Sequence, residues 1–498
     1  MSPDREIELK FACGPEDLAA VLAAAPKASL AGDDETRELI SVYFDTPDLV
    51  LQKAGASLRV REHKGKRIQT LKRGQGLVRE EHEAPIEGLA PDPALEPLPE
   101  LLPQGASLKP AFNVRVSRRQ RTFRYQGAEI ELALDQGEVS GGDQRRPICE
   151  VELELKSGPP AALFALAREL SAAAPLYLAF DSKASRGQAL VAGDAAPSAQ
   201  KSGKVALADG ATVGDAFQAI ARLALAQIAA NAAVLRESPL SPAAAPEAVH
   251  QLRVGARRLR SALSTFKAVL EGDGLETAKA DLKWLAANCG RARNLDVFAA
   301  ETLAPAELGA NPPPGVERLR AALDVAREAA WAQASQACAS ERFRALMIDA
   351  AAWVETGGWR AADGADKPVG PFARRALKTR LKKLGKRGRD VERGDDTARH
   401  HLRIEAKKLR YACDGFASLY GDKAVHRYLR HLKELQEVLG ALNDLATAAP
   451  LLAALALPSE AAFAAGELVG LQAAAKPRLV AGAAKALDRL QAADPFWG

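Results

Sequence analysis

Residues 5–11 of this 498-residue chain read Arg-Glu-Ile-Glu-Leu-Lys-Phe, a run in which charged and apolar side chains alternate. Side chains on a β-strand point alternately to opposite faces, so Glu6, Glu8 and Lys10 share one face. Ile7 and Leu9 occupy the other face. The segment therefore predicts a strand that is charged on one side and apolar on the other.

The same pattern recurs through roughly the first 190 residues, where turns rich in Gly, Pro and Asp separate the candidate strands. If the sheet closes, the charged faces line a polar lumen and helices cover the apolar faces. Helices are predicted at 15–25 and 160–173. The predicted strands are 5–11, 39–44, 57–62, 67–73, 79–86, 112–125, 128–135 and 148–156.

Carboxylates cluster on some of these strands and Arg or Lys on others. An ordinary solvated sheet face, the alternative interpretation, mixes such residues with Thr, Ser and Gln. Carboxylates at alternate positions supply the hard oxygen ligands that Mg²⁺ or Mn²⁺ requires, and Arg and Lys suit phosphate oxygens. The segregation of charge therefore favours a polyphosphate site with a metal ion at one side.

An ordered series of motifs supports the same interpretation. The series is Glu6-x-Glu8-x-Lys10, Tyr43-Phe44-Asp45-Thr46, Leu58-Arg59-Val60-Arg61, Gln69-Thr70-Leu71-Lys72, Glu131-Leu132-Ala133-Leu134-Asp135, Cys149-Glu150-Val151-Glu152-Leu153-Glu154 and Ser182-Lys183-x-x-Arg186-Gly187. It resembles the CYTH family, the triphosphate tunnel metalloenzymes, over residues 1–195. The resemblance implies an eight-stranded antiparallel β tunnel that hydrolyses inorganic triphosphate with Mg²⁺ or Mn²⁺.

Matching motifs also imply roles for individual residues. The implied phosphate-binding residues are Lys10, Arg59, Arg61, Lys72, Arg118 and Lys183. The carboxylates implied to hold metal or to position water are Glu6, Glu8, Asp135, Glu150, Glu152 and Glu154. The expected catalytic set is Glu6, Glu8, Lys10, Glu152 and Lys183. No nucleophilic Cys or Ser is required, because phosphoryl transfer depends on positioning and charge neutralisation.

After a linker at 196–210, the sequence changes to long helices rich in Ala and Leu, and we predict an all-α bundle over 211–498. The bundle repeats itself, because the motif that begins at His250 recurs at His400 with a constant offset of 150 residues. An internal two-fold duplication explains this, with halves of about 211–355 and 370–498. The predicted fold class is α+β multidomain.

Each repeat carries cations along one stripe of an amphipathic helix. His250, Arg253 and Arg257 share a helical face, and the apolar residues form a different stripe. One such helix alone would favour a solvated face paired with carboxylates on neighbouring helices. Two cationic stripes related by a pseudo-two-fold could instead face each other and form a channel for a long polyanion.

Both histidine motifs, together with the turns at 290–296 and 440–444, resemble the CHAD family, the conserved histidine α-helical domain. The resemblance implies binding of inorganic polyphosphate. The implied binding residues are His250, Arg253, Arg257, Arg260, His400, Arg403, Lys407, Lys408 and Arg410. Both histidines could instead be buried helix residues with satisfied hydrogen bonds. Asn294 stands where the family usually has Asp, which leaves open whether the first repeat is weakened.

Composition restricts the protein class. The net charge of +5 divides into −5 over residues 1–200 and +10 over the rest, so the two parts should meet different partners or different parts of one polyanion. Five scattered cysteines without a CxxC pair indicate neither a disulfide framework nor a zinc site. Because the sequence shows no apolar signal-peptide core, we expect a cytoplasmic protein, with association to polyphosphate granules left open, and no membrane partner.

Other functions remain open as alternatives. An adenylate cyclase or a thiamine triphosphatase would use the same tunnel, but it would need a pocket for an organic group, and no aromatic cluster lies near the charged strands. A non-catalytic polyphosphate-binding scaffold would lack the metal carboxylates. Nucleic acid is disfavoured, because no aromatic residues interleave the basic stripes. These patterns carry no signal of oligomeric state.

Overall fold

The computed structural model describes residues 5–27, 36–63, 65–74, 78–193, 197–237, 243–270, 272 and 274–498. The chain divides into two compact units. The tunnel unit comprises Met1–Ser198 with Ala339–Ala352, and the helical unit comprises Ala199–Cys338 with Trp353–Gly498. The segment Ala339–Ala352 thus groups with the tunnel unit, although the sequence places it within the helical part of the chain.

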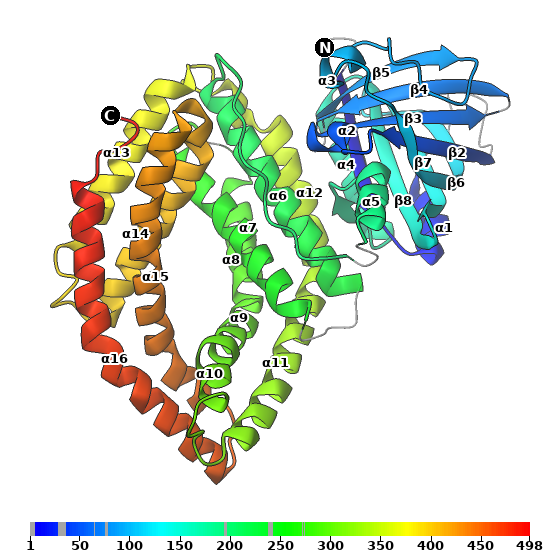
Figure 1. Cartoon of the computed structure of the whole chain (residues 1–498). Helices are drawn as coiled ribbons and strands as arrows, with labels where there is room; N and C mark the ends of the chain where they lie inside the picture. The colour runs from blue at the N-terminus through cyan, green and yellow to red at the C-terminus, as the bar shows by residue number, and fades with distance from the viewer. Residues whose placement is uncertain are drawn as a thin grey trace. The chain divides into compact units, whose positions relative to one another are not determined.

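Among the described residues, nine antiparallel strands form one sheet in the order β5-β4-β3-β2-β6-β7-β8-β1-β9. The first residues of β1 also pair with β5, so eight strands close into a barrel, as the family resemblance implied (Figure 1). The short β9 pairs with the second half of β1. The strands are β1 (Arg5–Ala12), β2 (Thr36–Asp45), β3 (Ala56–His63), β4 (Lys66–Arg73), β5 (Val78–Ile86), β6 (Lys109–Tyr125), β7 (Ala128–Gly141), β8 (Gln144–Ser157) and β9 (Tyr177–Ala179).

The outer face of the barrel is apolar and is covered by helices where β7, β8 and β1 meet. Leu9 of β1 and Val151 and Leu153 of β8 are fully buried. Helix α4 (Pro160–Ala173) packs against β7 and β8, and α1 (Leu18–Ala24) packs against α4. Burial of one such side chain contributes about 1.5–3 kcal/mol. A shift of the strand register by one residue would turn these apolar side chains away from the covering helices. The alternation of apolar and charged residues therefore determines which face of each strand points outward.

The inner face of the barrel is polar toward one end and apolar toward the other. At the apolar end, α5 (Lys183–Val191) lies against β6, β7 and β8. It comes so close to the Phe112 ring that no Cβ would fit at Gly187. Helix α5 thus closes this end as an apolar plug, and its first residues face the polar part. The plug packs with Leu39, Tyr43, Phe112, Val114, Val116, Val139 and Ile148.

The helical unit is built from long helices that form two similar halves (Figure 1). Helix α6 is long and apolar enough to cross a membrane by length and composition, but 61% of that segment is buried, and buried core helices meet the same two criteria. The helices of this part of the chain are α6 (Val213–Glu237), α7 (Ala245–Thr265), α8 (Leu275–Asn288), α9 (Gly290–Phe298), α10 (Ala304–Glu307), α11 (Val316–Ala339), α12 (Glu341–Thr356), α13 (Val369–Gly388), α14 (Asp396–Phe416), α15 (Asp422–Ala453) and α16 (Ser459–Ala492). The greater part of α12 belongs to the tunnel unit.

The predicted offset of 150 residues brings the helices of the two halves into correspondence, although some of their ends differ by several residues. It relates α6 to α13, α7 to α14, α8 with α9 to α15, and α11 to α16. One difference is that α8 and α9 are separated at Cys289, whereas α15 runs through the equivalent region without a break. The all-α bundle with an internal two-fold repeat is therefore present, and α12 is an additional helix between the halves.

Candidate functional site

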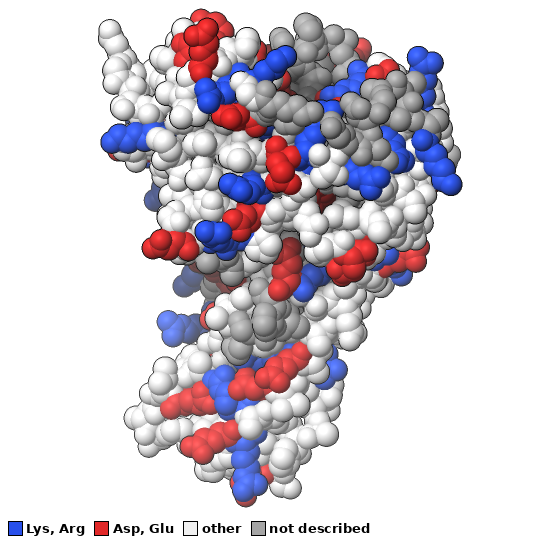
Figure 2. All heavy atoms as spheres, turned by 90° about the vertical axis from the view of Figure 1, so that its right-hand side faces the viewer, with Lys and Arg blue, Asp and Glu red and all other residues white. Residues whose placement is uncertain are grey.

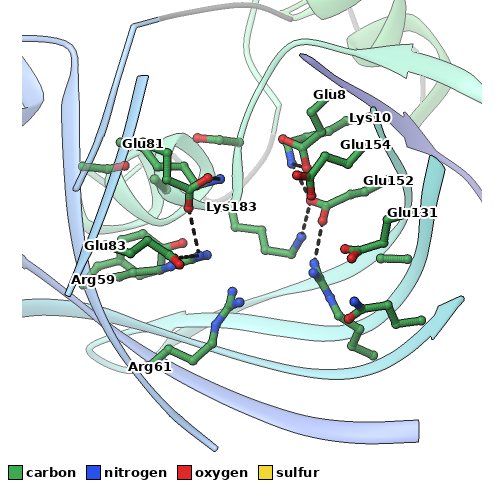
Figure 3. A pocket seen from close by; sticks show the side chains of 18 of the residues that line it. Glu8, Lys10, Arg59, Arg61, Glu81, Glu83, Glu131, Glu152, Glu154 and Lys183 are labelled. Atoms are coloured by element: carbon green, nitrogen blue, oxygen red, sulfur yellow. Dashed lines mark hydrogen bonds and ion pairs between the residues drawn. The ribbon is translucent and has the colours of Figure 1, made fainter. Parts of the chain in front are cut away.

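Three carboxylates lie side by side on the inner wall formed by β1, β8 and β7. Glu8 lies opposite Glu154, and Glu154 lies opposite Glu131. Lys156 Nζ lies 2.6 Å from Glu154 Oε1 and 3.5 Å from Glu131 Oε2. Figure 3 shows all three glutamates directed into the same cavity. This wall thus offers a row of carboxylate oxygens.

The next row on the same strands pairs a lysine with a glutamate. Lys10 lies opposite Glu152, and its Nζ donates to Glu8 at 2.7 Å and to Glu152. Glu152 also accepts from Arg118 Nη2 at 2.5 Å and from Lys183 Nζ at 2.9 Å. Burial alone would raise the pKa of Glu152, but Lys10 and the two other cations hold it well below its ordinary value. Glu152 therefore stays ionised.

The opposite wall, from β3, β4 and β5, combines two cations with two glutamates (Figure 3). Lys72 Nζ lies 2.9 Å from Glu81 Oε2. Arg59 Nη2 lies 3.7 Å from Glu81 Oε1 and 3.9 Å from Glu83 Oε1, which is longer than a hydrogen bond. The buried Nε of Arg59 has no hydrogen-bond partner among the described residues. Against the effect of burial, Tyr43 and the two glutamates raise the pKa of Arg59, so Arg59 is a fixed cation on this wall.

Arg61 adds a third guanidinium group to the same part of the barrel. Its Nε donates to Ser41 Oγ at 3.1 Å. Burial lowers the pKa of Arg61 to about 9, and the nearby Arg59 and Arg118 add to the decrease. An anion placed between these cations would relieve their mutual repulsion.

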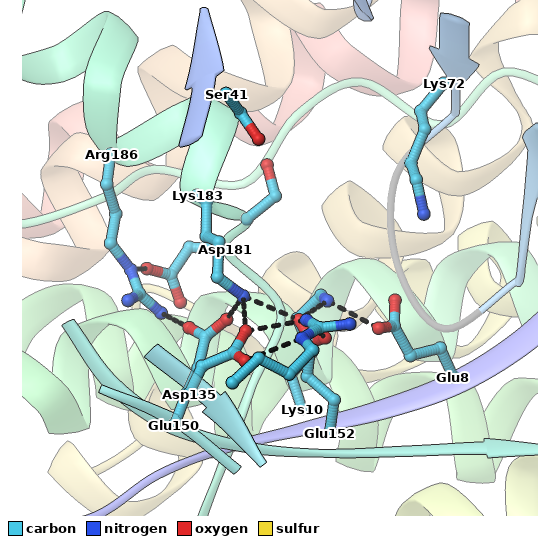
Figure 4. A network of polar contacts seen from close by, with 12 residues as sticks. Glu8, Lys10, Ser41, Lys72, Asp135, Glu150, Glu152, Asp181, Lys183 and Arg186 are labelled. Atoms are coloured by element: carbon cyan, nitrogen blue, oxygen red, sulfur yellow. Dashed lines mark hydrogen bonds and ion pairs between the residues drawn. The ribbon is translucent and has the colours of Figure 1, made fainter. Parts of the chain in front are cut away.

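Lys183, the first residue of α5, is the centre of a buried ion cluster below the cavity (Figure 4). Its Nζ lies 2.7 Å from Asp135 and 2.9 Å from Glu152, and it also contacts Glu150. Arg186, one turn along α5, lies 2.9 Å from Glu150. Burial would lower the pKa of Lys183, but Asp135 and Glu150 raise it above its ordinary value. Lys183 is therefore a permanent cation at the floor of the cavity.

Asp135 and Glu150 are fully buried and do not line the cavity. Asp135 accepts two hydrogen bonds from Arg118, at 2.7 and 2.6 Å. Oxygens of Asp135, Glu150 and Glu152 lie within 4.8 Å of one another, which is a spacing that could hold a metal ion. In the structure, however, cations hold these oxygens. The assignment of Asp135 and Glu150 as metal ligands stays a prediction, and the open glutamates of the β1, β8 and β7 wall are better placed.

The two charged walls and the floor enclose one cavity of about 350 Å³. The side chain of Glu6, a predicted metal and catalytic residue, lies outside the described part of the structure. The predicted residues that line the cavity are Glu8, Lys10, Arg59, Arg61, Lys72, Arg118, Glu152, Glu154 and Lys183. Glu81 and Glu83, which strand alternation also places on a charged face, line the cavity as well. The remaining lining residues are Tyr43, Ser57, Gln120, Glu131, Ala133, Lys156, Ser182 and Ala184. Strand alternation places Glu131 and Lys156 on charged strand faces, and Gln120 continues the face of Arg118 in the same way.

In the helical unit, cations from α7, α9 and α14 lie close together. Burial lowers the pKa of Lys407 to about 6, and Arg257 and Arg403 contribute. Burial likewise lowers the pKa of Arg253 to about 10, with Arg257 the next cause. The buried Nε atoms of Arg257 and Arg403 have no hydrogen-bond partner among the described residues. We call this set the cation cluster: His250, Arg253, Arg257, Arg293, Arg403 and Lys407.

The two halves contribute unequally to the cation cluster. The offset of 150 residues relates Arg293-Asn294 to Asn443-Asp444. Asp444 counteracts the lowered pKa of Lys407. In the first half, burial and then Arg293 lower the pKa of His250 to about 4. The turns predicted at 290–296 and 440–444 are instead helical, in α9 and α15. At this position the first half has one cation more and one carboxylate fewer than the second.

The other predicted polyphosphate-binding residues lie at the margin of the cluster or outside it. Arg260 and His400 are exposed, and His400 Nδ1 lies 2.9 Å from Asn443 Oδ1. Lys408 and Arg410 each pair with a carboxylate on their own helix. On the face drawn in Figure 2, Lys and Arg side chains lie interspersed with Asp and Glu.

Comparison with known proteins finds relatives of both units. The CYTH domain family matches residues 4–187, and the CHAD domain family matches residues 219–453. An inorganic triphosphatase of Haemophilus influenzae is 32% identical over 196 residues, which cover 37% of this chain and 55% of that protein. The chain thus spans about half the length of this relative.

Two solved structures are similar to part of this chain. The crystal structure of the CHAD domain from the plant Ricinus communis is 34% identical, with a TM-score of 0.52, and the match covers 59% of this chain and 96% of that one. PptA from Streptomyces chartreusis is 21% identical, with a TM-score of 0.40, and the match covers 56% of this chain and 99% of that one.

Proposed function

The chain joins a CYTH domain, which contains the barrel, to a CHAD domain, and from that premise we propose that it is a metal-dependent inorganic triphosphatase with a polyphosphate-binding helical unit. The proposed reaction is hydrolysis of tripolyphosphate to diphosphate and phosphate in the barrel cavity. The activity named for the Haemophilus influenzae relative supports the first half of the proposal. A cytoplasmic location belongs to the same proposal.

The observation that carries the proposal is the arrangement of charge in the cavity. Phosphoryl transfer requires positioning and neutralisation of phosphate oxygens, and fixed cations in a cavity of this kind supply both. The N-terminus of α5 adds a partial positive charge at the floor. The cations that would hold the phosphates are Lys10, Arg59, Arg61, Lys72, Arg118 and Lys183.

The carboxylate row fits a divalent metal ion. Glu8, Glu131 and Glu154 present hard oxygen donors to the cavity, which suits Mg²⁺ or Mn²⁺. A bound ion would add charge neutralisation at the transferred phosphoryl group. Lys156, which contacts two of these glutamates, is 37% exposed on its side chain and can turn away into solvent.

The lining of the cavity favours an inorganic substrate over an organic triphosphate. Among the lining residues, Tyr43 is the one aromatic side chain. Its ring stacks on Phe112 with centroids 4.6 Å apart, so one face is already covered. A nucleobase or a thiazolium ring would find charged side chains here instead of an apolar surface, and it would lose stacking energy.

The cation cluster supports polyphosphate binding by the helical unit. Burial and then neighbouring cations lower the pKa of Arg253 and Lys407, and the buried Nε atoms of Arg257 and Arg403 have no partner among the described residues. A polyanion would relieve both costs. Arg257→Ala combined with Lys407→Ala should therefore weaken polyphosphate binding, and the loss should be larger at low salt than at high salt.

The decisive experiment measures phosphate release from tripolyphosphate, ATP, thiamine triphosphate and long polyphosphate, each with Mg²⁺, Mn²⁺ or a chelator. Metal-dependent release that is fastest from tripolyphosphate is expected. Arg59→Ala should lower kcat/KM for tripolyphosphate by about 10²-fold or more. Arg67→Ala is the matched control, because Arg67 pairs with Glu62 at 2.9 Å and does not line the cavity.

Two outcomes would contradict the triphosphatase assignment. No release from any substrate, with polyphosphate still bound, would make the chain a polyphosphate-binding scaffold. Fastest release from ATP or thiamine triphosphate would identify an enzyme for organic triphosphates.

A further inference from the structure

Two cysteines that are 136 positions apart in the sequence lie next to each other in the wall of the barrel. Cys13 directly follows β1, and Cys149 lies in β8. The backbone N–H of Cys13 donates to the Cys149 carbonyl at 3.4 Å, and the two Sγ atoms are 3.7 Å apart. Both thiols are free and partly exposed, whereas the other three cysteines are buried.

The geometry allows a bond between these two sulfurs. The last register pair of β1 and β8 joins Ala12 to Glu150, and continuing it by one residue places Cys13 opposite Cys149. Opposite residues on antiparallel strands have Cβ atoms about 4.5–5.5 Å apart. A disulfide needs a Cβ separation of about 3.5–4.5 Å and an S–S length of about 2.05 Å. Rotation of the two side chains and a small adjustment of the strand end would therefore suffice.

We propose that Cys13 and Cys149 are a redox-modification site that forms a reversible disulfide on exposure to a hydroperoxide. One thiol sulfur attacks the O–O bond, which gives a sulfenic acid and releases water or an alcohol. The second thiol sulfur then attacks the sulfenic sulfur, which forms the S–S bond and releases water. The two thiols lose two electrons and two protons to the hydroperoxide, and a thiol reductant reverses the reaction.

The disulfide fastens β1 to the barrel. β1 supplies Glu8 and Lys10 to the cavity, and it is the strand whose pairing with β5 closes the ring. The bond also stands beside Glu150, which contacts Lys183 and Arg186. A cross-link that encloses most of the tunnel unit restricts the unfolded chain, so it should raise the unfolding temperature of that unit by roughly 5–10 °C.

The test treats the full-length chain with a small excess of hydrogen peroxide, blocks the remaining thiols under denaturing conditions, and maps peptides without reduction. The expected result is one cross-linked pair of peptides that contain Cys13 and Cys149, lighter by two hydrogens than the separate peptides. Cys289, Cys338 and Cys413 should remain alkylatable and serve as the internal reference. A thiol reductant should remove the cross-link.

Thermal unfolding of the oxidised and the reduced wild-type chain gives a second measurement that needs no variant. The oxidised form should unfold at the higher temperature, and Cys149→Ser should abolish the difference. Separate sulfinic or sulfonic acids on the two cysteines, or free thiols after treatment, would overturn the proposal. The result is independent of the proposed triphosphatase reaction, because neither measurement uses a phosphate substrate.

Discussion

Polyphosphate binding to the helical unit should take up a proton, and Lys407 should be the group that accepts it. Burial, with Arg257 and Arg403, lowers the pKa of Lys407 to about 6 in the free protein. At about pH 8, roughly one molecule in a hundred would then carry a charged Lys407. A bound polyanion favours the ammonium form and raises this pKa toward the ordinary value of 10.5.

The sign of the pH dependence follows from proton linkage. The complex holds more protons than the free protein at any pH between the two pKa values of Lys407. Affinity must therefore fall as the pH rises through that interval, by up to about tenfold in Kd per pH unit, or about 1.4 kcal/mol. In the free protein, Asp444 raises the pKa of Lys407 and Arg253 lowers it further.

Isothermal titration calorimetry at about pH 8 measures this uptake directly. When the binding enthalpy is plotted against the ionisation enthalpy of several buffers, the slope gives the number of protons, and a value of about one is expected. His250 should contribute little to the proton uptake measured at about pH 8, because even its ordinary pKa of 6.5 lies well below that pH.

Lys407→Met should abolish the slope. Lys279→Met is the matched control, since Lys279 pairs with Glu276 at 2.7 Å and is not a member of the cation cluster. A slope of zero in the wild type, or an unchanged slope in Lys407→Met, would refute the reasoning.

Three further predictions concern the barrel. Lys183→Met should remove tripolyphosphate hydrolysis, and it should lower the free energy of unfolding by about 3–5 kcal/mol because it leaves buried carboxylates unpaired. Enzyme kinetics and denaturant unfolding of the same preparation measure the two effects. Glu154→Gln should raise the Mg²⁺ concentration for half-maximal rate by about tenfold, measured by metal titration, and an unchanged titration would remove Glu154 from the metal site. Gly187→Ala should lower the free energy of unfolding, measured with denaturant, by about 1–3 kcal/mol, because the added Cβ would meet the Phe112 ring. Gly470→Ala should not lower it, because the space around that residue is open.

The charged face of each strand could be predicted from the sequence, because a strand has a fixed period of two. Glu8 and Lys10 face the cavity for that reason. The row that joins Glu8, Glu154 and Glu131 could not be predicted, since it depends on which strands are neighbours and on their register. Alternation identifies the residues of a face but not their opposite partners.

The role of α5 also lies beyond sequence reasoning. A motif marked Lys183 as a phosphate ligand, but the entry of its helix into one end of the barrel depends on packing against distant strands. The same packing buries Asp135 and Glu150 away from the cavity. The family motifs had implied that both hold metal, and neither the motifs nor strand alternation contains information about depth along the barrel axis.

In the helical unit, the repeat alone predicted which helices correspond, since duplicated sequences fold alike. Helix α12 has no equivalent in the second half, and no sequence pattern predicted that its first part would group with the other unit. The difference between Asn294 in α9 and Asp444 in α15 could be recognised from the alignment of the halves. Their electrostatic effect on Lys407 and His250 depends on distances between helices.

The apolar plug that α5 forms closes one end of the barrel, so the cavity opens at the other end only. A long phosphate chain cannot thread through, so only a free terminus can reach Lys183. Each product must leave by the mouth through which the substrate entered. Cleavage of long polyphosphate would then be strictly exolytic and distributive, with one bond broken per visit, and cyclic polyphosphates, which have no ends, would resist it.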